Sequence, residues 1–564
     1  MPTLSTSKRR VPLAIHSFRR ALGVNRFETF QHRRKRLEAA ALNTIAPISS
    51  LPPEILCHIF LFYASTSPLH GLGWLAVTHV IHHWRAVALA CPELWANLIL
   101  HRKLMPMMLV RSKEASLIIR VDLNYRTDLA SRHIRENIAR VGVLDVRGSQ
   151  HALDAFFVDH VGKSSAPRLR SLSVVNLTTA GDPLWLDARV FHSAEKRMGH
   201  IPRQLRLEKC ALPWNSPWYS NLTNLHLADF HKAHSPTITM LLSVIISSPR
   251  LQHLTLINTQ TRVDGLDRSF PFALRDLRSI RVSEPISVCA QILMNLTFPS
   301  VVAVDVCCLP APAFPETHGS LVDTVLCHRD FCQTYNFLRI DAPTRDCFRI
   351  DTSSYLTDKT LRIEIHYGAR PPSLGPALNN LVKYSNIFFS RITTLHVNTV
   401  ALGNDSWRHL RKCRNLATLT LQTIDPLPIL TLLLECAMRC IGVSVRPEFE
   451  VDIDLNGVRR QLFPELRCIE LNDIDCGNPY PSPTDVLRSL LWARRTGRCP
   501  IPRVRVAACK NVFQQDLDYL RFLTNSFFRD GVGQNPGEKE DGGYIDVRSF
   551  SLNVFEHLHI SRIY

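Results

Sequence analysis

A short apolar motif recurs along most of this chain and limits the folds that the chain can adopt. The motif is L-x-x-L-x-L, with Val or Ile allowed at the apolar positions, and its copies start 24 to 29 residues apart or near multiples of that interval. The clear copies are LRSLSV at 169–174, LTNLHL at 222–227, LQHLTL at 251–256, LRSIRV at 277–282, VVAVDV at 301–306, ITTLHV at 392–397, LATLTL at 416–421 and LRCIEL at 466–471; VGVLDV at 141–146 is weaker. Alternating apolar and polar residues over so short a run are typical of a β-strand that buries one face. The recurrence predicts an array of similar units in place of one compact core.

An apolar helical segment precedes several of these strands, and a proline marks its start. Examples lie within residues 235–256, 284–306, 425–440 and 482–497. Ser, Asp or Glu before the proline supplies an acceptor near the helix N-terminus, and proline at the first helical position costs no backbone bond. Each unit is therefore predicted to be helix, turn and strand, with neighbouring units stacked into a continuous core. The period is that of leucine-rich repeats; the alternative is an ordinary α/β domain with βα units.

The repeats are irregular. The Asn or Cys that usually closes each turn is mostly missing, although Asn176, Asn258 and Asn472 lie near that place. Residues 307–360 show only fragments of the pattern, namely FLRI at 337–340 and, just beyond them, LRIEI at 361–365, so we expect distorted repeats or an insertion there. Towards the end, the composition of residues 535–543 predicts a flexible loop, and residues 547–554 are expected to form a strand against the end of the array.

Length and charge divide the chain further. It has 564 residues, 45% of them hydrophobic, which is too long for one core and apolar enough to fold over most of its length. The net charge is +18, and residues 1–37 supply half of it, because ten Lys or Arg there face a single acid, Glu28. We expect residues 1–25 to be a disordered basic tail and residues 26–47 to be helical. A solvated or nuclear-import tail is favoured over a mitochondrial transit segment, and any contact with nucleic acid is expected to be nonspecific.

Neither the apolar runs nor the cysteines indicate a membrane-spanning or secreted protein. No stretch of eighteen apolar residues occurs, so we expect no membrane span. The 16 cysteines include no C-x-x-C pair, which favours a reduced, intracellular protein with free buried thiols. The predicted location is the cytoplasm, the nucleus or both.

Sequence motifs for catalysis are missing. The chain lacks G-x-G-x-x-G, a Walker loop, G-x-S-x-G and H-E-x-x-H. The tripeptide at 328–330, His-Arg-Asp, matches the start of a kinase catalytic loop, but Tyr335 stands where that loop needs Asn. We therefore predict a protein that is not an enzyme and that needs no cofactor.

Two groups of residues offer soft metal ligands. They are Cys327 with His328 and Cys332, and Cys436 with Cys440. Each group lacks a second pair at zinc spacing. Buried thiols are the favoured interpretation, and no metal site is predicted.

The stretch LPPEILCHIF at 51–60 predicts a helix that starts abruptly. Pro52 and Pro53 end the preceding segment, and Pro53 can be the first helical residue with Glu54 in the first turn, favourable to the helix dipole. The apolar residues that follow recur at i, i+1, i+4 and i+5; this stripe is wide enough to pack inside and still leave apolar surface outside. A second helical segment follows at 74–95.

These two segments resemble the F-box family. LPPEILCHIF is similar to the family's L-P-x-E-[IL]-L-x-x-I-F, and VIHHWRAVALACPELW resembles its V-C-x-x-W-R-x-x-A-x-x-x-x-L-W. The resemblance covers residues 48–98 and is nearest to the F-box-like proteins of mushroom-forming fungi, which often carry degenerate leucine-rich repeats. The chain departs from the family pattern at Ile81, where many members have Cys, and in a longer STSPLHGLG spacer.

The resemblance implies a substrate-recognition subunit of a cullin–RING (SCF-type) ubiquitin ligase. Such a protein binds the ligase adaptor through its F-box and a protein substrate through its repeats. The implied adaptor contacts are Leu51, Pro52, Glu54, Ile55, Leu56, Ile59, Phe60, Val80, Trp84 and Arg85. The alternative is that these residues form only the core of a helical hairpin.

The predicted fold class is α/β: an N-terminal helical F-box module at 48–98 and a leucine-rich-repeat-like α/β solenoid at 140–564. In each repeat the polar residues that alternate with the last apolar ones should line the concave strand face. We expect the substrate there, at His226, His253, Arg281, His396 and Thr420. The alternatives are a ligase-independent protein-binding scaffold and, less favoured, a nucleic-acid-binding protein that uses the basic tail.

Overall fold

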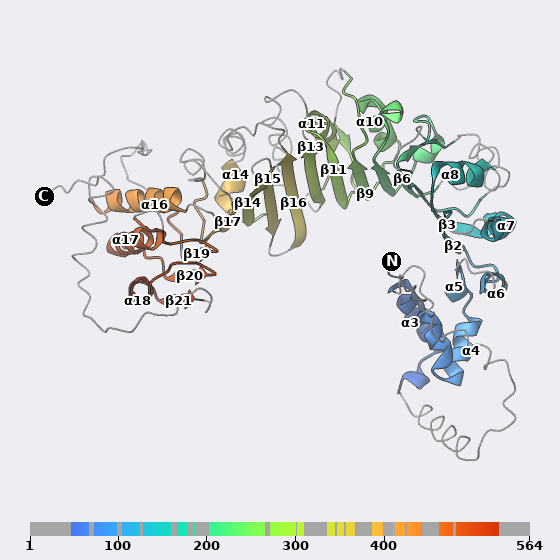
Figure 1. The fold of residues 1–564 in the computed structure, drawn as a ribbon, viewed down its shortest axis with the longest axis horizontal. Coiled ribbons are helices and arrows are strands. Elements are labelled where there is room, and N and C mark those ends of the chain that lie inside the picture. The colour runs from blue at the N-terminus through green and yellow to red at the C-terminus, as the bar shows by residue number, and fades with distance from the viewer. Residues whose placement is uncertain are drawn as a thin grey trace, which may run out of the picture. The chain divides into compact units, whose positions relative to one another are not determined.

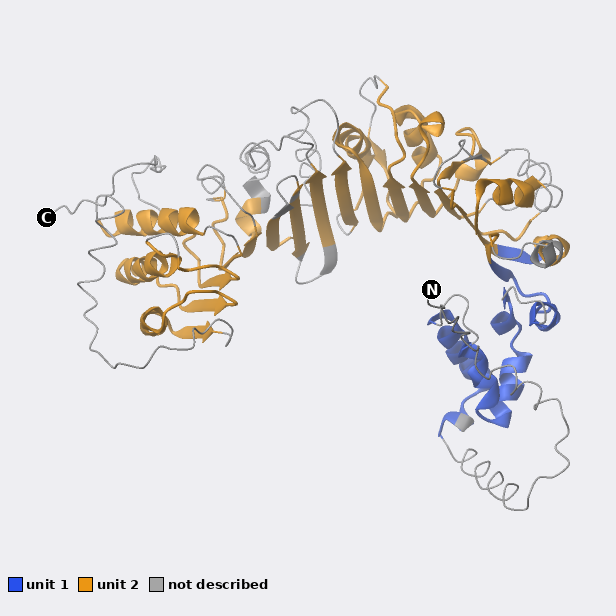
Figure 2. Cartoon of the chain, viewed as in Figure 1, with its two compact units in different colours: residues 1–120, 140–142 blue, residues 121–139, 143–564 orange. Residues whose placement is uncertain are grey.

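The computed structural model places most of the chain between residues 47 and 529. The described residues are 47–66, 73–98, 104–124, 128–158, 166–178, 184–186, 202–264, 271–299, 302–309, 335–344, 347–354, 357–366, 386–398, 410, 412–422, 426–442, 462–477 and 481–529. The basic tail, almost all of the helix predicted at 26–47, the cluster at 327–332 and the predictions for 535–554 lie outside them. Two compact units are present, Met1–Arg120 with Arg140–Gly142, and Val121–Ala139 with Val143–Tyr564 (Figure 2). A helix with the length and apolar character to cross a bilayer does not occur among the described residues.

The first unit is mainly helical. Its elements are η1 Pro47–Ser50, α3 Pro53–Thr66, η2 Gly73–His79, α4 His82–Ala90, α5 Pro92–Trp95, β1 Asn97–Leu98, α6 Leu104–Arg111 and β2 Leu117–Asp122, whose last two residues belong to the second unit. As predicted, α3 begins at Pro53 with Glu54 in its first turn. The second predicted helix is divided, because the chain leaves the helix after η2 and Ile81 is extended before α4 begins.

Aromatic rings form the core of the first unit. The ring centroids of Phe60 and Trp84 lie 5.3 Å apart, and those of Trp74 and Trp95 lie 5.2 Å apart, nearly edge to face. The indole N–H of Trp95 donates to the carbonyl oxygen of Ala88 at 2.8 Å, so its one polar atom is satisfied inside the core. These contacts connect α3, η2, α4 and α5.

The second unit is a mixed α/β structure built on a large, mostly parallel sheet. Its strands are β3 Val141–Gly148, β4 Ser171–Asn176, β5 Leu184–Trp185, β6 Gln204–Glu208, β7 Cys210–Ala211, β8 Asn224–Ala228, β9 His253–Ile257, β10 Phe272–Ala273, β11 Ser279–Pro285, β12 Leu296–Thr297, β13 Ala303–Leu309, β14 Phe337–Thr344, β15 Cys347–Ser354, β16 Thr357–His366, β17 Thr394–Asn398, β18 Thr418–Leu421, β19 Cys468–Asn472, β20 Arg503–Ala507 and β21 Ser526–Arg529. Two small separate pairs, β5 with β7 and β10 with β12, complete the set.

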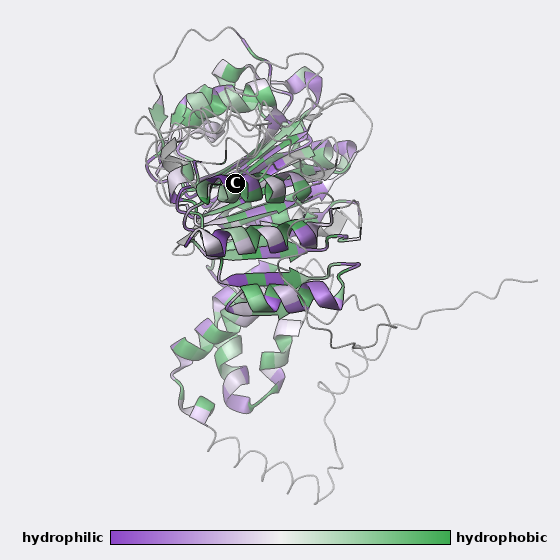
Figure 3. Ribbon diagram, turned by 90° about the vertical axis from the view of Figure 1, so that its left-hand side faces the viewer, coloured by the Kyte–Doolittle hydropathy of each residue, from purple (hydrophilic) through white to green (hydrophobic). Residues whose placement is uncertain are grey.

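The helices of the second unit lie on one face of this sheet, and no described helix of this unit covers the other face, here called the open face (Figure 1). They are α7 Asp128–Asn137, η3 Ile138–Arg140, α8 Gln150–Phe156, η5 Pro217–Tyr219, η6 Lys232–His234, α10 Ile238–Ile246, α11 Ile286–Met294, α14 Asn386–Arg391, α16 Leu427–Cys440, α17 Pro483–Thr496 and α18 Gln514–Leu523. Figure 3 shows hydrophobic and hydrophilic residues interleaved along helices and strands, as expected where each element buries one side. Ser482 starts α17 with a capping box, in which its hydroxyl and the carboxylate of Asp485 bond each other's backbone N–H.

Every copy of the apolar motif forms a strand, as the sequence predicts. Successive strands pair in parallel with their apolar residues in register: Leu225 lies beside Leu254, Leu254 beside Ile280 and Ile280 beside Val304. These side chains are at most 1% exposed, while the residues between them are half-buried or exposed on the other face. The register thus builds one continuous apolar layer beneath the helices.

Residues 335–366 interrupt the parallel order with an antiparallel meander. Strand β15 runs opposite to both its neighbours, β14 and β16. The sheet order along this part is β13–β16–β15–β14–β17, with β16 parallel to β13 and β14 parallel to β17. Where distorted repeats or an insertion were expected, the described residues therefore form strands that continue the sheet.

The turns after the strands share one backbone feature that the sequence does not show. Lys209, Asp229, Asn258, Asp473 and Ala508 each follow a strand directly, and each has a φ between 48° and 54°. The N–H of each of the first four donates to a carbonyl of the next strand at 2.8 or 2.9 Å. The repeats are thus closed by a common left-handed turn.

Cysteine thiols close two of these turns. Cys210 Sγ donates to the carbonyl oxygen of Val174 at 3.5 Å, and Cys509 Sγ donates to that of Leu471 at 3.4 Å. Each cysteine lies directly after a left-handed turn residue. The Asn or Cys that usually closes each turn was expected to be mostly missing. In these two repeats a cysteine is present at that place.

Replacement of Leu254 by Asp should unfold the second unit. Leu254 is 0% exposed between two apolar neighbours, and an unpaired buried carboxylate costs several kcal/mol. Thr255→Asp is the matched control, because this side chain lies on the open face between His226 and Arg281. Urea denaturation followed by circular dichroism should show a large loss of stability for the first variant and little change for the second. Equal stability of the two variants would contradict the assignment of the faces.

Candidate functional site

Helix α3 of the first unit carries apolar side chains on two different sides, one buried and one exposed. Leu56 and Phe60 are 0% and 1% exposed and pack into the aromatic core. On the other side, Ile55, Ile59 and Phe62 are 45%, 40% and 73% exposed. Their spacing of four and three residues places them in one row, here called the α3 stripe.

The predicted adaptor contacts separate into surface and core residues. Pro52, Glu54, Ile55, Ile59, Val80 and Arg85 are exposed, and Leu51 and Trp84 are half-buried. Leu56 and Phe60 are buried and hold α3 against the rest of the unit, so their part in adaptor contact stays a prediction. Their burial follows from the width of the apolar stripe, which the sequence alone could not divide into an inner and an outer half.

Two further exposed residues were missed by the sequence reasoning. Phe62 continues the row of Ile55 and Ile59, and Tyr63, 45% exposed, lies next to it. Extending the i, i+4, i+7 spacing beyond the ten-residue motif would have found Phe62.

The open face of the sheet presents one row of paired side chains, here called the central row. It is Asp145, Ser173, Arg206, His226, Thr255, Arg281, Asp305, Arg362, Asp351, Arg339, His396, Thr420, Glu470, Arg505 and Phe528. From Arg281 to Arg339 the sign of the charge alternates from strand to strand. Alternating charges at cross-strand distance favour this register by up to about 1 kcal/mol per pair.

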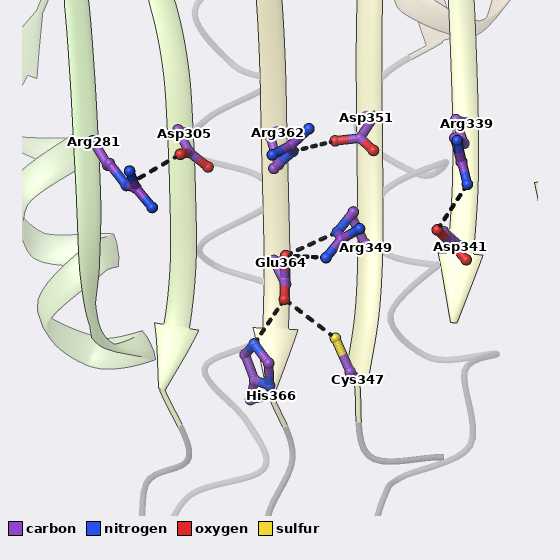
Figure 4. A network of polar contacts seen from close by, with 10 residues as sticks. All are labelled: Arg281, Asp305, Arg339, Asp341, Cys347, Arg349, Asp351, Arg362, Glu364 and His366. Carbon is purple, nitrogen blue, oxygen red and sulfur yellow. Dashed lines mark hydrogen bonds and ion pairs between the residues drawn. The ribbon is translucent and has the colours of Figure 1, made fainter. Parts of the chain in front are cut away.

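The carboxylates in the middle of this face are paired with arginines (Figure 4). Arg281 Nε lies 3.3 Å from Asp305, Arg362 Nε lies 2.7 Å from Asp351, and Arg339 lies 3.2 Å from Asp341. Arg281 and Arg362 remain 61% and 53% exposed. The face therefore presents fixed charges of both signs, with these two arginine side chains well exposed.

The five residues predicted to contact a substrate all lie on this face. Arg281 is exposed; His226, His253 and His396 are half-buried; and His253 Nδ1 is 2.7 Å from the hydroxyl of Ser279. Thr420 is only 7% exposed, because its hydroxyl donates to Glu470 of the neighbouring strand at 3.1 Å. It therefore offers little surface to a partner.

Two of these histidines are held in the neutral form. Burial lowers the pKa of His226, and the nearby charge of Arg206 lowers it further. Burial likewise lowers the pKa of His396, with a further contribution from Arg339. At neutral pH both rings are therefore neutral hydrogen-bonding groups.

A cluster of sulfur, carboxylate and imidazole groups lies on the open face where β13, β16 and β15 meet. Cys307, Glu364 and His366 offer ligand atoms that all lie within 4.8 Å of one another, and Cys347 Sγ is 3.6 Å from Glu364 Oε1. Burial raises the pKa of Cys347 to about 12, and the charge of Glu364 adds to the effect. Burial also raises the pKa of the Glu364 carboxyl, but the hydrogen bond and charge of Arg349 outweigh it and the net pKa is lowered. These residues were not grouped by the sequence reasoning because they are far apart in the chain.

Comparison with known proteins does not identify this chain. No family model matches it, and the search of curated proteins gives no match. The F-box and leucine-rich-repeat resemblances therefore rest on the quoted residues alone.

Core and surface phenylalanines of α3 should respond differently to truncation. Phe60→Ala removes a buried ring that packs on Trp84 and should lower the stability of the first unit by about 3–5 kcal/mol. Phe62→Ala, two residues further along the same helix, should change the stability of the first unit by less than about 0.5 kcal/mol because the side chain is exposed. Denaturant melts of the two variants measure the difference; similar losses would refute the division of α3 into two sides.

Proposed function

We propose that this protein is a substrate-receptor subunit of a cullin–RING (SCF-type) ubiquitin ligase. The α3 stripe docks the ligase adaptor, and the open face of the sheet captures a protein substrate. The observation that carries the proposal is the α3 stripe, because it extends an F-box-like motif and leaves large apolar side chains at the surface.

Several features of the first unit support the adaptor half of this proposal. The motif residues divide into a set that builds the helical core and a set that remains accessible on one side of α3. Apolar helix faces of this kind dock into grooves through residues spaced i, i+4 and i+7. Pro52 and Glu54, at the start of the helix, add exposed residues at the edge of the same surface.

The arrangement of the second unit supports a leucine-rich-repeat-like solenoid. Successive strands pair in parallel with a neighbour 24 to 29 residues away in the regular part of the array, as Leu225 with Leu254 and Ile280 with Val304 illustrate. Helices lie on one face, and the turn after several strands has the same left-handed residue. Stacked units of this kind leave an extended strand face for a partner.

The chemistry of that face suits a polar segment with charges of both signs. Exposed arginines can each form a two-pronged bond with a carboxylate of a partner. The acidic neighbours of these arginines can in turn accept bonds from a partner's basic groups. The neutral histidines add hydrogen bonds that do not depend on charge.

Loss of the α3 stripe should abolish adaptor binding. Ile55→Glu with Ile59→Glu places two charges on an apolar docking surface, and buried apolar contacts cost about 1–3 kcal/mol each when lost. Co-purification with the adaptor protein should fall at least tenfold. Met240→Glu with Ile246→Glu is the matched control, since both residues are exposed apolar positions on α10 (44% and 48%).

Adaptor recovery that is the same for both double variants would falsify the ligase proposal. In that case a ligase-independent binding scaffold becomes the better description. Circular dichroism of the stripe variant confirms that the first unit is still folded, which its exposed positions predict.

Reversing two charges on the open face should impair substrate capture without unfolding the protein. We expect Arg281→Glu with Arg362→Glu to remove interactors identified by proximity labelling while adaptor binding stays within error. The melting temperature should fall but the chain should stay folded, because each Glu then lies beside Asp305 or Asp351 on a neighbouring strand. The matched control is Arg467→Glu with Arg521→Glu, because these arginines are also exposed and ion-paired, with Glu465 and Asp518. Each lost surface ion pair costs less than about 1 kcal/mol. An interactor list identical to that of the control would remove the open face from the proposal.

A further inference from the structure

Three neighbouring strands bring four metal-ligating side chains to one place on the open face. Cys307 lies on β13 beside Glu364 on β16, and Cys347 on β15 lies directly opposite His366 on β16. Glu364 and His366 are two residues apart on one strand, so their side chains point to the same face. The two cross-strand pairs are therefore neighbours on the same face of the sheet.

Three of the four ligand atoms lie close enough together to share one ion, and the fourth, Cys347 Sγ, lies beside one of them. Those of Cys307, Glu364 and His366 all lie within 4.8 Å of one another, and Glu364 Oε1 is 2.9 Å from His366 Nε2 and 3.6 Å from Cys347 Sγ. In a tetrahedral zinc site with bonds of about 2.0–2.3 Å, the ligand atoms are roughly 3.3–3.8 Å apart. Cys347 Sγ lies outside the group of three and would have to turn towards the ion to complete a tetrahedral site.

Glu364 is oriented as a ligand by a neighbouring arginine. Arg349, beside it on β15, holds Oε2 at 2.8 Å through Nε and Nη2. The other oxygen, Oε1, faces the imidazole and the thiol of Cys347 (Figure 4). Ligating carboxylates in metal sites are commonly fixed by such an outer hydrogen bond.

We propose that Cys307, Cys347, Glu364 and His366 form a zinc-binding site. Two sulfur atoms, one imidazole nitrogen and one carboxylate oxygen make a ligand set that suits Zn²⁺ and disfavours the hard ions Mg²⁺ and Ca²⁺. All four positions are filled by protein, as in structural zinc sites, so the ion would have a structural role.

The place of the site in the sheet explains what the ion would do. The antiparallel direction of β15 is what puts Cys347 opposite His366, and β13 to β16 is the first junction of the inserted meander with the parallel strands. An ion bound here joins β13, β16 and β15 side chain to side chain. It would add a side-chain link on the open face to the apolar register that Leu361, Ile363 and Ile365 already make with β13 on the other face.

The test uses the purified full chain, stripped with a chelator and titrated with Co²⁺ as a spectroscopic probe and then with Zn²⁺. We expect one ion per chain, cobalt absorption typical of thiolate ligation, and a higher melting temperature with zinc. Cys307→Ser with Cys347→Ser should weaken zinc binding by at least about 100-fold. Loss of a residue that only orients a ligand already weakens metal binding by about 10–100-fold, and loss of the ligands themselves should cost more. Cys468→Ser with Cys499→Ser is the matched control, because both cysteines are half-buried and lie on or near other strands.

A second variant keeps the test decisive if the double cysteine variant does not fold. His366 is 34% exposed, so His366→Ala should be tolerated and should weaken zinc binding to a similar extent. The proposal is overturned if the wild-type chain takes up no stoichiometric zinc. It is also overturned if the variants of the four ligands bind zinc as tightly as the Cys468/Cys499 control.

Discussion

The in-register pairing of parallel strands is the constraint on which the second unit depends. Each strand has apolar side chains at alternate positions, and only pairing without a one-residue slip keeps them on the helix side of the sheet. Leu225, Leu254, Ile280 and Val304 show the result, a file of side chains almost completely removed from water. The same register fixes the other face, where it sets Arg281 beside Asp305 and Asp305 beside Arg362. Core and surface are thus two outcomes of one alignment.

Much of the fold could be predicted from the sequence because its strands repeat one pattern. IPRVRV at 501–506 has the same spacing as the recognised copies and forms β20, although it was overlooked. The strand β6 has Leu205 and Leu207 but a proline, Pro202, at the first apolar place, so the pattern is incomplete there. The order of β14, β15 and β16 could not be predicted, since strand direction depends on long-range pairing that periodicity does not encode.

The surfaces were less predictable than the strands. Leu56 and Ile59 look equivalent in the F-box-like motif, yet one is buried and the other is exposed. The difference depends on which side of α3 meets Trp84 and the other aromatic rings, and that is a tertiary contact. Similarly, the alternation of polar residues indicated an open strand face, but the pairing of Arg362 with Asp351 joins strands whose neighbourhood the repeat pattern did not reveal.

The antiparallel meander also has a consequence for how the chain folds. Strands β14, β15 and β16 pair with partners adjacent in sequence, whereas parallel neighbours such as β18 and β19 must close long intervening segments first. Local pairings form faster, because less chain entropy is lost before contacts are gained. The meander would then be a nucleus in the interior of the array, with β16 as the template for β13 on one side and β14 as the template for β17 on the other. Growth from the interior in both directions would shorten the time during which unpaired strand edges are exposed to other chains.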